Sequence, residues 1–488
     1  MSRLSAETLP GLAPSAARPA YAREGVTAGI VHLGIGAFHR AHMAVYVDDL
    51  LAGDPGWGIV GASLRRPDTK DALDPQNGLY TVAIRDASGT KLRVIGSILE
   101  VIDANRERER LIALMASPNI RIVSLTVTEK GYCHDPATGE LDENHPDIVA
   151  DLANPQAPVS APGIIVEALA RRRAAGIAPF TVMSCDNLPD NGRTTQRIIA
   201  RLAALRDPEL GTHVAETVAF PSTMVDRIVP ATTDADRTLV RDELGVEDAW
   251  PIMTEPFTQW VVEDRFPLGR PTLETVGAEL VEDVEPYELM KLRMLNGSHS
   301  SIAYLGYLAG HQHVSDAMGD KAFVELIHGL MSEEVIPTLP MARAELEAYR
   351  DRLLERFANP ALKHRTWQIA MDGSQKLPQR LLDTIRDRLA AGQSIDRLAL
   401  GVAGWMRYVT GVDETGGAID VRDPLAARFA EIAASSGRDA EALARALAGI
   451  PEIFGTDLPG NPAFMGPVVA ALESLFAKGA AATVAARA

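Results

Sequence analysis

Residues 285–299 place four polar side chains of catalytic type on a helical segment whose apolar residues point in all directions, as in a buried helix. The segment reads EPYELMKLRMLNGSH, and the four side chains belong to Glu288, Lys291, Asn296 and His299. At about 100° per residue, an α-helix keeps all four within a sector of roughly 140°, so they share one broad face. Lysine is almost never fully buried without a partner or a role. Four such residues on one core helix therefore favour a function.

The chemistry that these residue types suggest is proton transfer at an oxygen atom. Burial lowers the pKa of a lysine, which makes Lys291 a usable general base near neutral pH. Asn296 can donate a hydrogen bond to an oxygen that develops negative charge, and His299 can orient a hydroxyl group. The structural alternative is that Glu288 and Lys291 form an ion pair at i,i+3, with Asn296 and His299 satisfied in the core.

A glycine turn near the N-terminus is the second feature with chemical meaning. The apolar run 29–33 is followed by Gly34, Ile35 and Gly36 and then by a helical pattern. A strand that turns into a helix through glycines presents backbone N–H groups to a pyrophosphate. His39 occupies the place of the third glycine of the dinucleotide fingerprint. A plain strand–helix turn, with glycine there for packing, is the alternative.

Asp68 follows the second apolar run, 58–64, and is placed to hold a ribose hydroxyl, which favours NAD over NADP. Its spacing from Gly34 is longer than the usual separation of about 20 residues. The neighbouring Arg65 and Arg66 could accept a 2′-phosphate instead. Asp68 could also be the N-cap of the helix that follows.

These residues need a doubly wound α/β domain and a helical domain to position them. The alternation of short apolar runs with helical patterns predicts a parallel sheet covered by helices; the runs are 29–33, 58–64, 120–127 and 180–184. Residues 80–84 and 92–95 predict an added hairpin, and from about residue 286 only helical spacing recurs. We expect a surface arm at 1–22, a dinucleotide-binding domain with insertions at 23–285 and a mostly helical substrate domain at 286–488.

The composition excludes several classes of protein. Of the 488 residues, 46% are hydrophobic and 23% are charged, which are ordinary globular values. The net charge of −17 argues against nucleic-acid and anionic membrane partners. The two cysteines, Cys133 and Cys185, cannot form a four-cysteine zinc site and imply no disulfide framework. We expect a cytoplasmic protein that has no resident metal.

Six segments give the chain a resemblance to the polyol-specific long-chain dehydrogenases, the mannitol dehydrogenase family. They are IVHLGIGAFHRAH (30–42), IVSLTVTEKGY (122–132), TVMSCDNLPDNG (181–192), FPSTMVDRIVP (220–230), MKLRMLNGSH (290–299) and MDGSQKLP (371–378). The Lys-x4-Asn-x2-His pattern of the fifth segment is specific, and the segments span nearly the whole chain. The resemblance implies a Rossmann-like first domain and a metal-independent, NAD(P)-dependent oxidation of a secondary alcohol.

The resemblance also implies roles for single residues. Lys291 would be the general acid/base, and Asn187 and Asn296 would hold the reacting oxygen. His299 would orient the substrate, and Glu288 would relay the proton towards solvent. The other positions that match the family are Asp226 and Lys376 in the substrate site, and Gly34, Gly36, Phe38, Arg40 and Asp68 around the cofactor.

Residues 364–382 bear on the substrate. Mannitol-oxidising members typically have an arginine eight residues before the position of Lys376, where this chain has Gln368. The string HRTWQIAMDGSQKLPQRLL resembles the fructuronate reductase (D-mannonate oxidoreductase) branch, which interconverts D-fructuronate and D-mannonate. A uronate carboxylate needs a cation, for which Arg293, Arg365 and Arg380 are candidates unless all three form structural ion pairs.

Two other functions stay open at this point. The first is a mannitol 2-dehydrogenase or another polyol dehydrogenase of the same family. The second is a sugar or nucleotide sensor without catalysis, against which the complete set of lysine, asparagine and histidine residues argues. In each case the expected partner is a small-molecule sugar acid or polyol.

Overall fold

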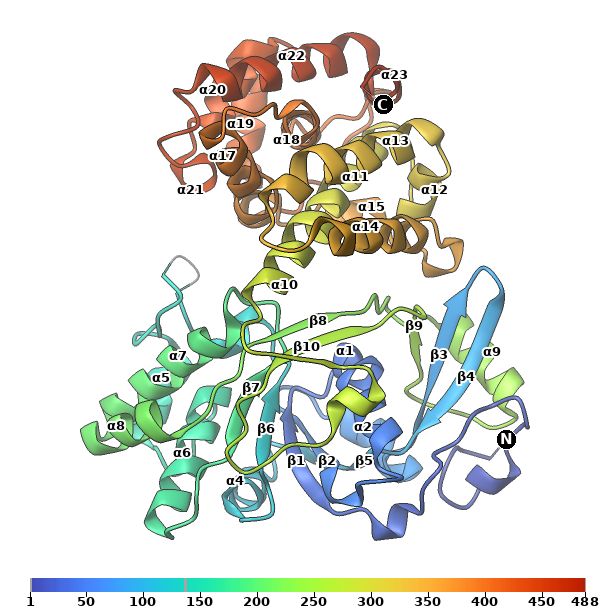
Figure 1. Ribbon diagram of the computed structural model, residues 1–488, viewed down its shortest axis with the longest axis vertical. Helices are drawn as coiled ribbons and strands as arrows, with labels where there is room; N and C mark the ends of the chain where they lie inside the picture. The colour runs from blue at the N-terminus through green and yellow to red at the C-terminus, as the bar shows by residue number, and fades with distance from the viewer. Residues whose placement is uncertain (1, 136–137, 488) are drawn as a thin grey trace. The chain divides into compact units, whose positions relative to one another are not determined.

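The computed structural model describes residues 2–135 and 138–487, which form two compact units, Met1–Glu285 and Pro286–Ala488. Figure 1 shows strands and helices in the first unit and helices in the second. Among the described residues, every helix is too short or too polar to cross a membrane.

The core of the first unit is a five-stranded parallel sheet in the order β5-β2-β1-β6-β7. Its strands are β1 (Ala28–Leu33), β2 (Gly58–Ser63), β5 (Ile98–Asp103), β6 (Ile122–Leu125) and β7 (Thr181–Ser184). One face packs on α4, α6 and α7, and the other packs mainly on α2. The four apolar runs are therefore strands buried on both faces, and the predicted doubly wound fold is confirmed. The strand order changes direction between β1 and β6, where such sheets bind ligands.

Two small sheets complete the first unit. The expected hairpin is β3 (Tyr80–Asp86) with β4 (Gly89–Ile95), and β9 (Ile252–Thr254) pairs with β3. The other sheet contains β8 (Thr223–Asp226), β10 (Gln259–Glu263) and β11 (Glu279–Val281). The helices of this unit are α1 (Ala37–Ala41), α2 (Met43–Leu50), α3 (Asp68–Leu73), α4 (Arg108–Ala116), α5 (Pro146–Ala153), α6 (Ala161–Ala174), α7 (Asn191–Arg206), α8 (Pro208–Thr217) and α9 (Asp234–Leu244).

Three apolar side chains of the segment expected to be a surface arm, 1–22, are buried instead. Leu4, Leu12 and Ala16 are buried in an apolar cluster that also contains residues of the hairpin and of α9. The backbone N–H of Leu4 donates to the carbonyl of Glu247 at 2.8 Å. The arm expectation rested on Pro and Ala content, but the apolar side chains that this segment does carry cover a face of the hairpin that would otherwise meet water.

The second unit is helical, as expected. Its helices after α10 (Glu285–Met290) are α11 (Gly297–Leu308), α12 (Val314–Met318), α13 (Lys321–Gly329), α14 (Arg343–Phe357), α15 (Thr366–Ile369), α16 (Gly373–Leu377), α17 (Asp383–Ala390), α18 (Asp396–Tyr408), α19 (Ala426–Ser436), α20 (Ala440–Ala448), α21 (Pro451–Phe454), α22 (Pro462–Lys478) and α23 (Ala480–Ala485). Helix α18 is central, because it packs against both α11 and α22.

The segment that carries Lys291 is not a uniform α-helix. Between α10 and α11 the chain forms a π-helical turn, η7 (Lys291–Asn296). A π turn is wider, so each residue rotates by less than 100° and Asn296 lies closer in direction to Lys291 than the roughly 140° of an α-helix. A second π turn, η11 (Pro378–Leu382), packs against η7. At this contact a Cβ on Gly297 would lie 2.8 Å from the carbonyl oxygen of Arg380, so the approach requires glycine.

Candidate functional site

The first unit has a pocket of about 660 Å³ at the carboxyl edge of its parallel sheet. The wall takes residues from the ends of β1, β2 and β6, among them Gly34, Gly36, Ser63, Arg65 and Thr126. This is the place where the strand order changes direction. The position and size of the pocket suit a dinucleotide.

The glycine turn in this pocket has the geometry that a phosphate-binding turn needs. Gly34 has a φ of +89°, and a Cβ there would lie 2.2 Å from the carbonyl oxygen of Thr126. Only glycine satisfies both conditions. A Cβ on Gly36 would meet only the carbonyl oxygen of Gly34, at 3.8 Å, so the space beside Gly36 is open. The residues present therefore fit a pyrophosphate.

Two stacked histidines fill the space under the turn where the fingerprint has its third glycine. The rings of His32 and His39 lie 3.4 Å apart between centroids. His32 bonds to the hydroxyls of Ser124 and Thr126, each at 2.8 Å. Burial lowers the pKa of His32 to about 3 and that of His39 well below its usual value, so both rings are neutral. Our sequence analysis had not singled out His32, because a histidine inside an apolar strand carries no signal of its partner.

Asp68 opens α3, and its carboxylate lies 3.8 Å from Nη1 of Arg66. The N-cap of that helix is Pro67, so Asp68 is not the cap that we had considered. Arg65 and Arg66 line the pocket at the end of β2. The two arginines therefore lie in the pocket wall, whereas Asp68 is not among its lining residues and is near the pocket only through its ion pair with Arg66.

The side chain of Arg40 is buried and hydrogen-bonded within the first unit. It is 4% exposed, and its Nη1 donates to the carbonyl of Trp250 at 2.6 Å. The Tyr80 hydroxyl donates to the carbonyl of Arg40 at 2.6 Å. Phe38 stacks on His42 with 5.0 Å between ring centroids. The Arg40 side chain therefore packs within the first unit, whereas Phe38 is half-buried.

Asn187 lies on the loop after β7, and Asp226 is the last residue of β8. Asn187 is exposed, whereas Asp226 is 4% exposed. The Asn187 loop is anchored by Asn191, whose Nδ2 donates to the carbonyls of Asp186 and Thr223 at 3.0 and 2.8 Å. Asn191 also accepts from the backbone N–H of Thr223 at 2.9 Å. The Asn187 loop is thereby held to the start of β8.

Asp186 is a positioning residue that the sequence analysis passed over. Its carboxylate accepts from the backbone N–H groups of Val127 and Thr128 at 2.9 and 3.0 Å and from the Tyr132 hydroxyl at 2.9 Å. Thr128 lies in the pocket wall with a φ of +64°, which is uncommon for a residue with a side chain. The carboxylate therefore holds a strained residue of the wall in place.

In the second unit, η7 and α11 carry the residues predicted to do chemistry. Lys291 is 9% exposed and His299 is 6% exposed, while Glu288 and Asn296 are half-buried. Nε2 of His299 is buried and has no hydrogen-bond partner among the described residues. The His299 ring contacts those of Phe357 and His364, at centroid distances of 4.5 and 5.2 Å. Such an atom suits a hydrogen bond to a bound ligand.

Positive charge surrounds His299. Burial and then the charges of His364, Arg380 and Arg356 hold the pKa of His299 well below its usual value. Burial and then Lys376 lower the pKa of His364 to about 4. Both rings are therefore neutral near pH 7, and three basic side chains, Arg380, Arg356 and Lys376, act on them.

The candidate cations differ in how they are engaged. Arg293 forms a 2.6 Å ion pair with Asp387 and donates to the Thr338 hydroxyl at 2.9 Å. Arg365 is exposed and lines another pocket, of about 400 Å³, together with Asp413 and Glu414. Arg380 is half-buried and donates to the Ser300 hydroxyl at 3.2 Å. Lys376 donates to the Met371 carbonyl at 2.6 Å, and Gln368 is exposed on α15.

Comparisons with known proteins agree with this division into two units. Residues 28–275 match the Mannitol dehydrogenase Rossmann domain, and residues 283–476 match the Mannitol dehydrogenase C-terminal domain. The chain belongs to the mannitol dehydrogenase family. It is accordingly an oxidoreductase that acts on CH–OH donors, and the resemblance drawn from the sequence is confirmed.

Three relatives show how far the similarity extends. A D-mannonate oxidoreductase of Escherichia coli (strain K12) is 51% identical over 477 residues, which cover 96% of this chain and 98% of the relative. A mannitol 2-dehydrogenase of Phaeosphaeria nodorum is 43% identical over 475 residues, 96% of this chain and 82% of the relative. The structure of Pseudomonas fluorescens mannitol 2-dehydrogenase in a ternary complex with NAD and D-mannitol has a TM-score of 0.88 at 41% identity, covering 99% of this chain and 98% of that one. These relatives belong to one family, but their names give two different substrates, D-mannonate and mannitol.

The open space beside Gly36 predicts that Gly36→Ala weakens dinucleotide binding without harming the fold. The added methyl meets no close protein atom, but it occupies space that a pyrophosphate needs. We expect the affinity for NADH, measured by fluorescence titration, to fall at least about tenfold, the equivalent of 1.4 kcal/mol. Gly34→Ala is the contrasting variant, because it also collides with Thr126 and should lower the melting temperature. Wild-type NADH affinity in Gly36→Ala would contradict the assignment of the turn.

The lowered pKa of His364 predicts a pH-dependent loss of stability. Below a pH of about 6.5 the unfolded chain binds a proton at this residue, but the folded unit does not until the pH approaches 4. Stability from His364 is therefore present at neutral pH and falls with acidification. The free energy of unfolding of the wild type, minus that of His364→Gln, should fall by about 1.4 kcal/mol per pH unit between these limits.

Urea unfolding followed by circular dichroism at several pH values measures this difference. The matched control is His328→Gln on α13, because an exposed side chain meets nearly the same solvent before and after unfolding. Parallel pH profiles for the wild type and His364→Gln would show that the fold does not lower the pKa of His364.

Proposed function

We propose that the protein interconverts D-fructuronate and D-mannonate with NAD as its cofactor. The observation that supports this substrate most is the set of basic side chains around the contacting rings of His299 and His364, namely Arg380 and Arg356 for His299 and Lys376 for His364. A uronate offers a carboxylate to such a set, whereas a polyol offers only hydroxyl groups. The 51% identity to a D-mannonate oxidoreductase over nearly the whole chain supports the same substrate class.

Lys291 is the proton carrier in this proposal. It accepts the proton of the carbinol hydroxyl during oxidation, for which the amine must be neutral, and returns it to the oxygen during reduction. The residue is 9% exposed, so bulk water has little access to the amine. Half-buried Glu288 lies just before Lys291 in the chain and passes the proton on towards solvent.

Asn296 and Asn187 stabilise the reacting oxygen while it carries negative charge. Each amide N–H₂ that acts as such a donor contributes about 3 kcal/mol to the transition state. Asn296 lies on the same π turn as Lys291 and ends it. The unpartnered Nε2 of His299 orients a neighbouring hydroxyl of the substrate.

The cofactor is held by the first unit. Gly34 and Gly36 take the pyrophosphate at the turn after β1, and Asp68 binds the ribose at the end of β2. When bound, NAD supplies the acceptor and donor of the hydride. The related structure that contains NAD supports this choice over NADP, while Arg65 and Arg66 in the pocket wall are the feature that would favour a 2′-phosphate.

Arg380 is the residue that we assign to the substrate carboxylate. It acts electrostatically on His299, and its segment packs against η7. Arg293 is committed to Asp387 and Thr338. Arg365 lines a pocket that none of the residues assigned to chemistry lines. Of the three arginines, Arg380 alone combines proximity to His299 with the helix that carries Lys291.

Mannitol 2-dehydrogenase is the second candidate function. It is favoured by the 0.88 TM-score to an enzyme structure that contains D-mannitol. The two functions differ at the terminal carbon of the substrate, which is a carboxylate in one and a hydroxymethyl group in the other. A sensor without catalysis is disfavoured because the lysine, both asparagines and the histidine are all present.

The substrate assignment predicts faster NADH consumption with D-fructuronate than with D-fructose. In Arg380→Gln the kcat/KM for D-fructuronate should fall about 10–100-fold, because a charge-assisted hydrogen bond worth roughly 1.5–3 kcal/mol is lost. Any activity with D-fructose should stay within a few-fold of the wild type. Arg365→Gln is the matched control and should resemble the wild type with both substrates. Turnover of D-fructose alone would overturn the proposed substrate.

The assignment of Lys291 predicts that Lys291→Ala slows the chemical step about 10²–10⁴-fold, because general acid–base catalysis is worth that much. NADH affinity should be unchanged, since the dinucleotide turn belongs to the first unit. Single-turnover kinetics with NADH and D-fructuronate measure the chemical step, and fluorescence titration measures NADH binding. A near-normal rate in this variant would remove Lys291 from its role.

A further inference from the structure

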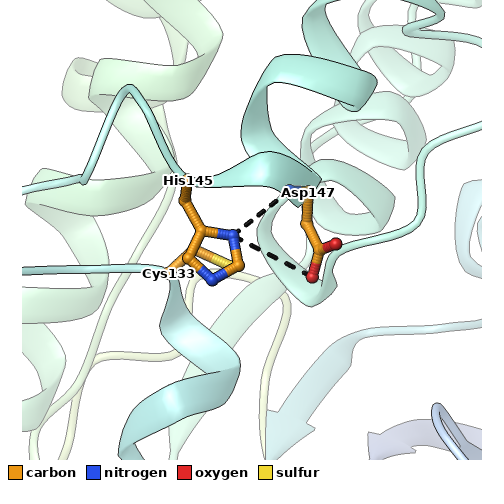
Figure 2. A group of neighbouring side chains, drawn as sticks. All are labelled: Cys133, His145 and Asp147. Carbon is orange, nitrogen blue, oxygen red and sulfur yellow. Dashed lines mark hydrogen bonds and ion pairs between the residues drawn. The ribbon is translucent and has the colours of Figure 1, made fainter.

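Three side chains of the first unit, none of them assigned to the reaction, form a group with the composition of a metal site. Cys133, His145 and Asp147 each offer one ligand atom, and these atoms all lie within 4.8 Å of one another. Figure 2 shows the imidazole of His145 facing the carboxylate of Asp147, with Cys133 beside the ring. Sulfur, nitrogen and oxygen thus converge from two separate stretches of chain.

The backbone holds both stretches in place. Cys133 follows the short 3₁₀ helix η5 (Glu129–Tyr132) with a φ of +51°, which is uncommon for a residue with a side chain. The carbonyl of Cys133 accepts from the N–H of Asp142 at 2.9 Å, which closes the connection to α5. His145 is the N-cap of α5 and Asp147 lies in its first turn, where the Asp147 N–H donates to Nδ1 of His145 at 3.2 Å. The three side chains are therefore brought together by the fold of the loop.

The surroundings favour a cation. Cys133 is 3% exposed, and the carboxylates of Asp147, Asp151 and Asp142 act on its sulfur, opposed by Arg65. Nδ1 of His145 and Oδ2 of Asp147 are 4.0 Å apart. An imidazole, a carboxylate and a thiol that converge beside further carboxylates are well matched to a metal ion, which would replace the Asp147 N–H at Nδ1 of His145 or bind Nε2 instead.

The donor set selects the ion. Calcium and magnesium take six or more oxygen ligands, which this group cannot supply. Zinc takes sulfur, nitrogen and oxygen in a tetrahedron, and its bond lengths separate neighbouring ligand atoms by about 3.3–3.5 Å. The present Nδ1–Oδ2 distance of 4.0 Å closes to that value by small rotations of His145 and Asp147, whose side chains are 32% and 53% exposed. Three protein ligands leave the fourth position for water.

We propose that Cys133, His145 and Asp147 bind one Zn²⁺ ion in the wall of the 660 Å³ pocket and that the bound ion weakens dinucleotide binding. On binding, the Cys133 thiol releases its proton to solvent as the Zn–S bond forms. Cys133 and Asp147 both line the pocket that contains Gly34 and Gly36, so the ion and its water occupy room in that pocket. This second consequence rests on the proposed function, because it takes the pocket to be the dinucleotide site.

The first test uses Co²⁺ as a spectroscopic substitute for Zn²⁺ on the full-length protein. One equivalent of Co²⁺ should produce the visible bands of a tetrahedral site together with a sulfur-to-cobalt charge-transfer band, and Zn²⁺ should abolish both. Cys133→Ser should remove the charge-transfer band and weaken metal binding at least about tenfold. His145→Gln, whose side chain lies nearer the surface, should weaken binding without risk to the core.

The matched control is Cys185→Ser, because Cys185 is the other buried cysteine of the chain. It should keep the spectrum of the wild type. Absence of stoichiometric Co²⁺ or Zn²⁺ binding, or an equal effect of the two cysteine variants, would overturn the site. These outcomes do not depend on which sugar the protein converts.

The second test measures NADH affinity by fluorescence with and without saturating Zn²⁺. In the wild type the affinity should fall severalfold when Zn²⁺ is bound, and in Cys133→Ser it should not change. By linkage, NADH should weaken Zn²⁺ binding by the same factor. Equal NADH affinity in both conditions, with the Co²⁺ spectrum present, would overturn the effect on the dinucleotide. Loss of NADH binding altogether would instead overturn the proposed function.

Discussion

The close contact between two π turns is the constraint on which the second unit depends. Gly297 at the end of η7 allows the carbonyl of Arg380 in η11 to approach to a distance that a Cβ would block. The same wide turn brings Asn296 towards the side of Lys291. A π turn costs regular hydrogen bonding and is therefore rare, and its frequent use at functional sites fits the side chains that it carries here. One backbone irregularity thus places the proposed proton carrier, an amide donor and a cation in a single packed region.

In the first unit, hydrogen bonds of polar side chains hold the loops at the edge of the sheet in place. Asp186 ties the loop after β7 to the loop after β6, and Asn191 ties it to β8. A buried carboxylate is costly unless it is well bonded, and that of Asp186 accepts three hydrogen bonds. These bonds keep Thr128 in a conformation that it would leave if the chain were free. The loops at the carboxyl edge of the sheet are therefore rigid enough to present Asn187 and a dinucleotide pocket.

The sequence predicted the parts of the fold that depend on periodicity. The four buried strands, the hairpin and the change to helices near residue 286 all follow from apolar spacing and were found. The π turn could not be predicted, because its residues have ordinary helical composition and the irregularity arises from packing against η11. The burial of Leu4, Leu12 and Ala16 was missed for a similar reason, since a Pro- and Ala-rich segment shows no period even when its few apolar side chains have a partner surface.

Site residues could be predicted from the sequence where their type is unusual among their neighbours. Residues that act by holding another residue in place could not be predicted in this way. Lys291 was noticeable as a charge in an apolar helix, and Gly34 as a break between strand and helix. Asp186 and His32 sit in ordinary-looking strings, and their importance lies in partners 58 and 92 residues away in the chain. The cluster of Cys133 with His145 and Asp147 was also hidden in the sequence, because its members come from separate stretches of the chain. The hydrogen bond from the Asp142 N–H to the Cys133 carbonyl helps to bring the cysteine to the start of α5.

The electrostatics of the second unit also decide which group can carry a proton. Burial is the largest cause of the lowered pKa of His299, and the neighbouring His364, Arg380 and Arg356 side chains add to it. A substrate carboxylate beside Arg380 would offset part of that positive potential, but it would not remove the burial. His299 therefore stays neutral with or without a bound uronate and is suited to orientation by hydrogen bonds. Of the two basic side chains on η7 and α11 that are proposed to meet the substrate, only Lys291 is left to gain and lose the proton.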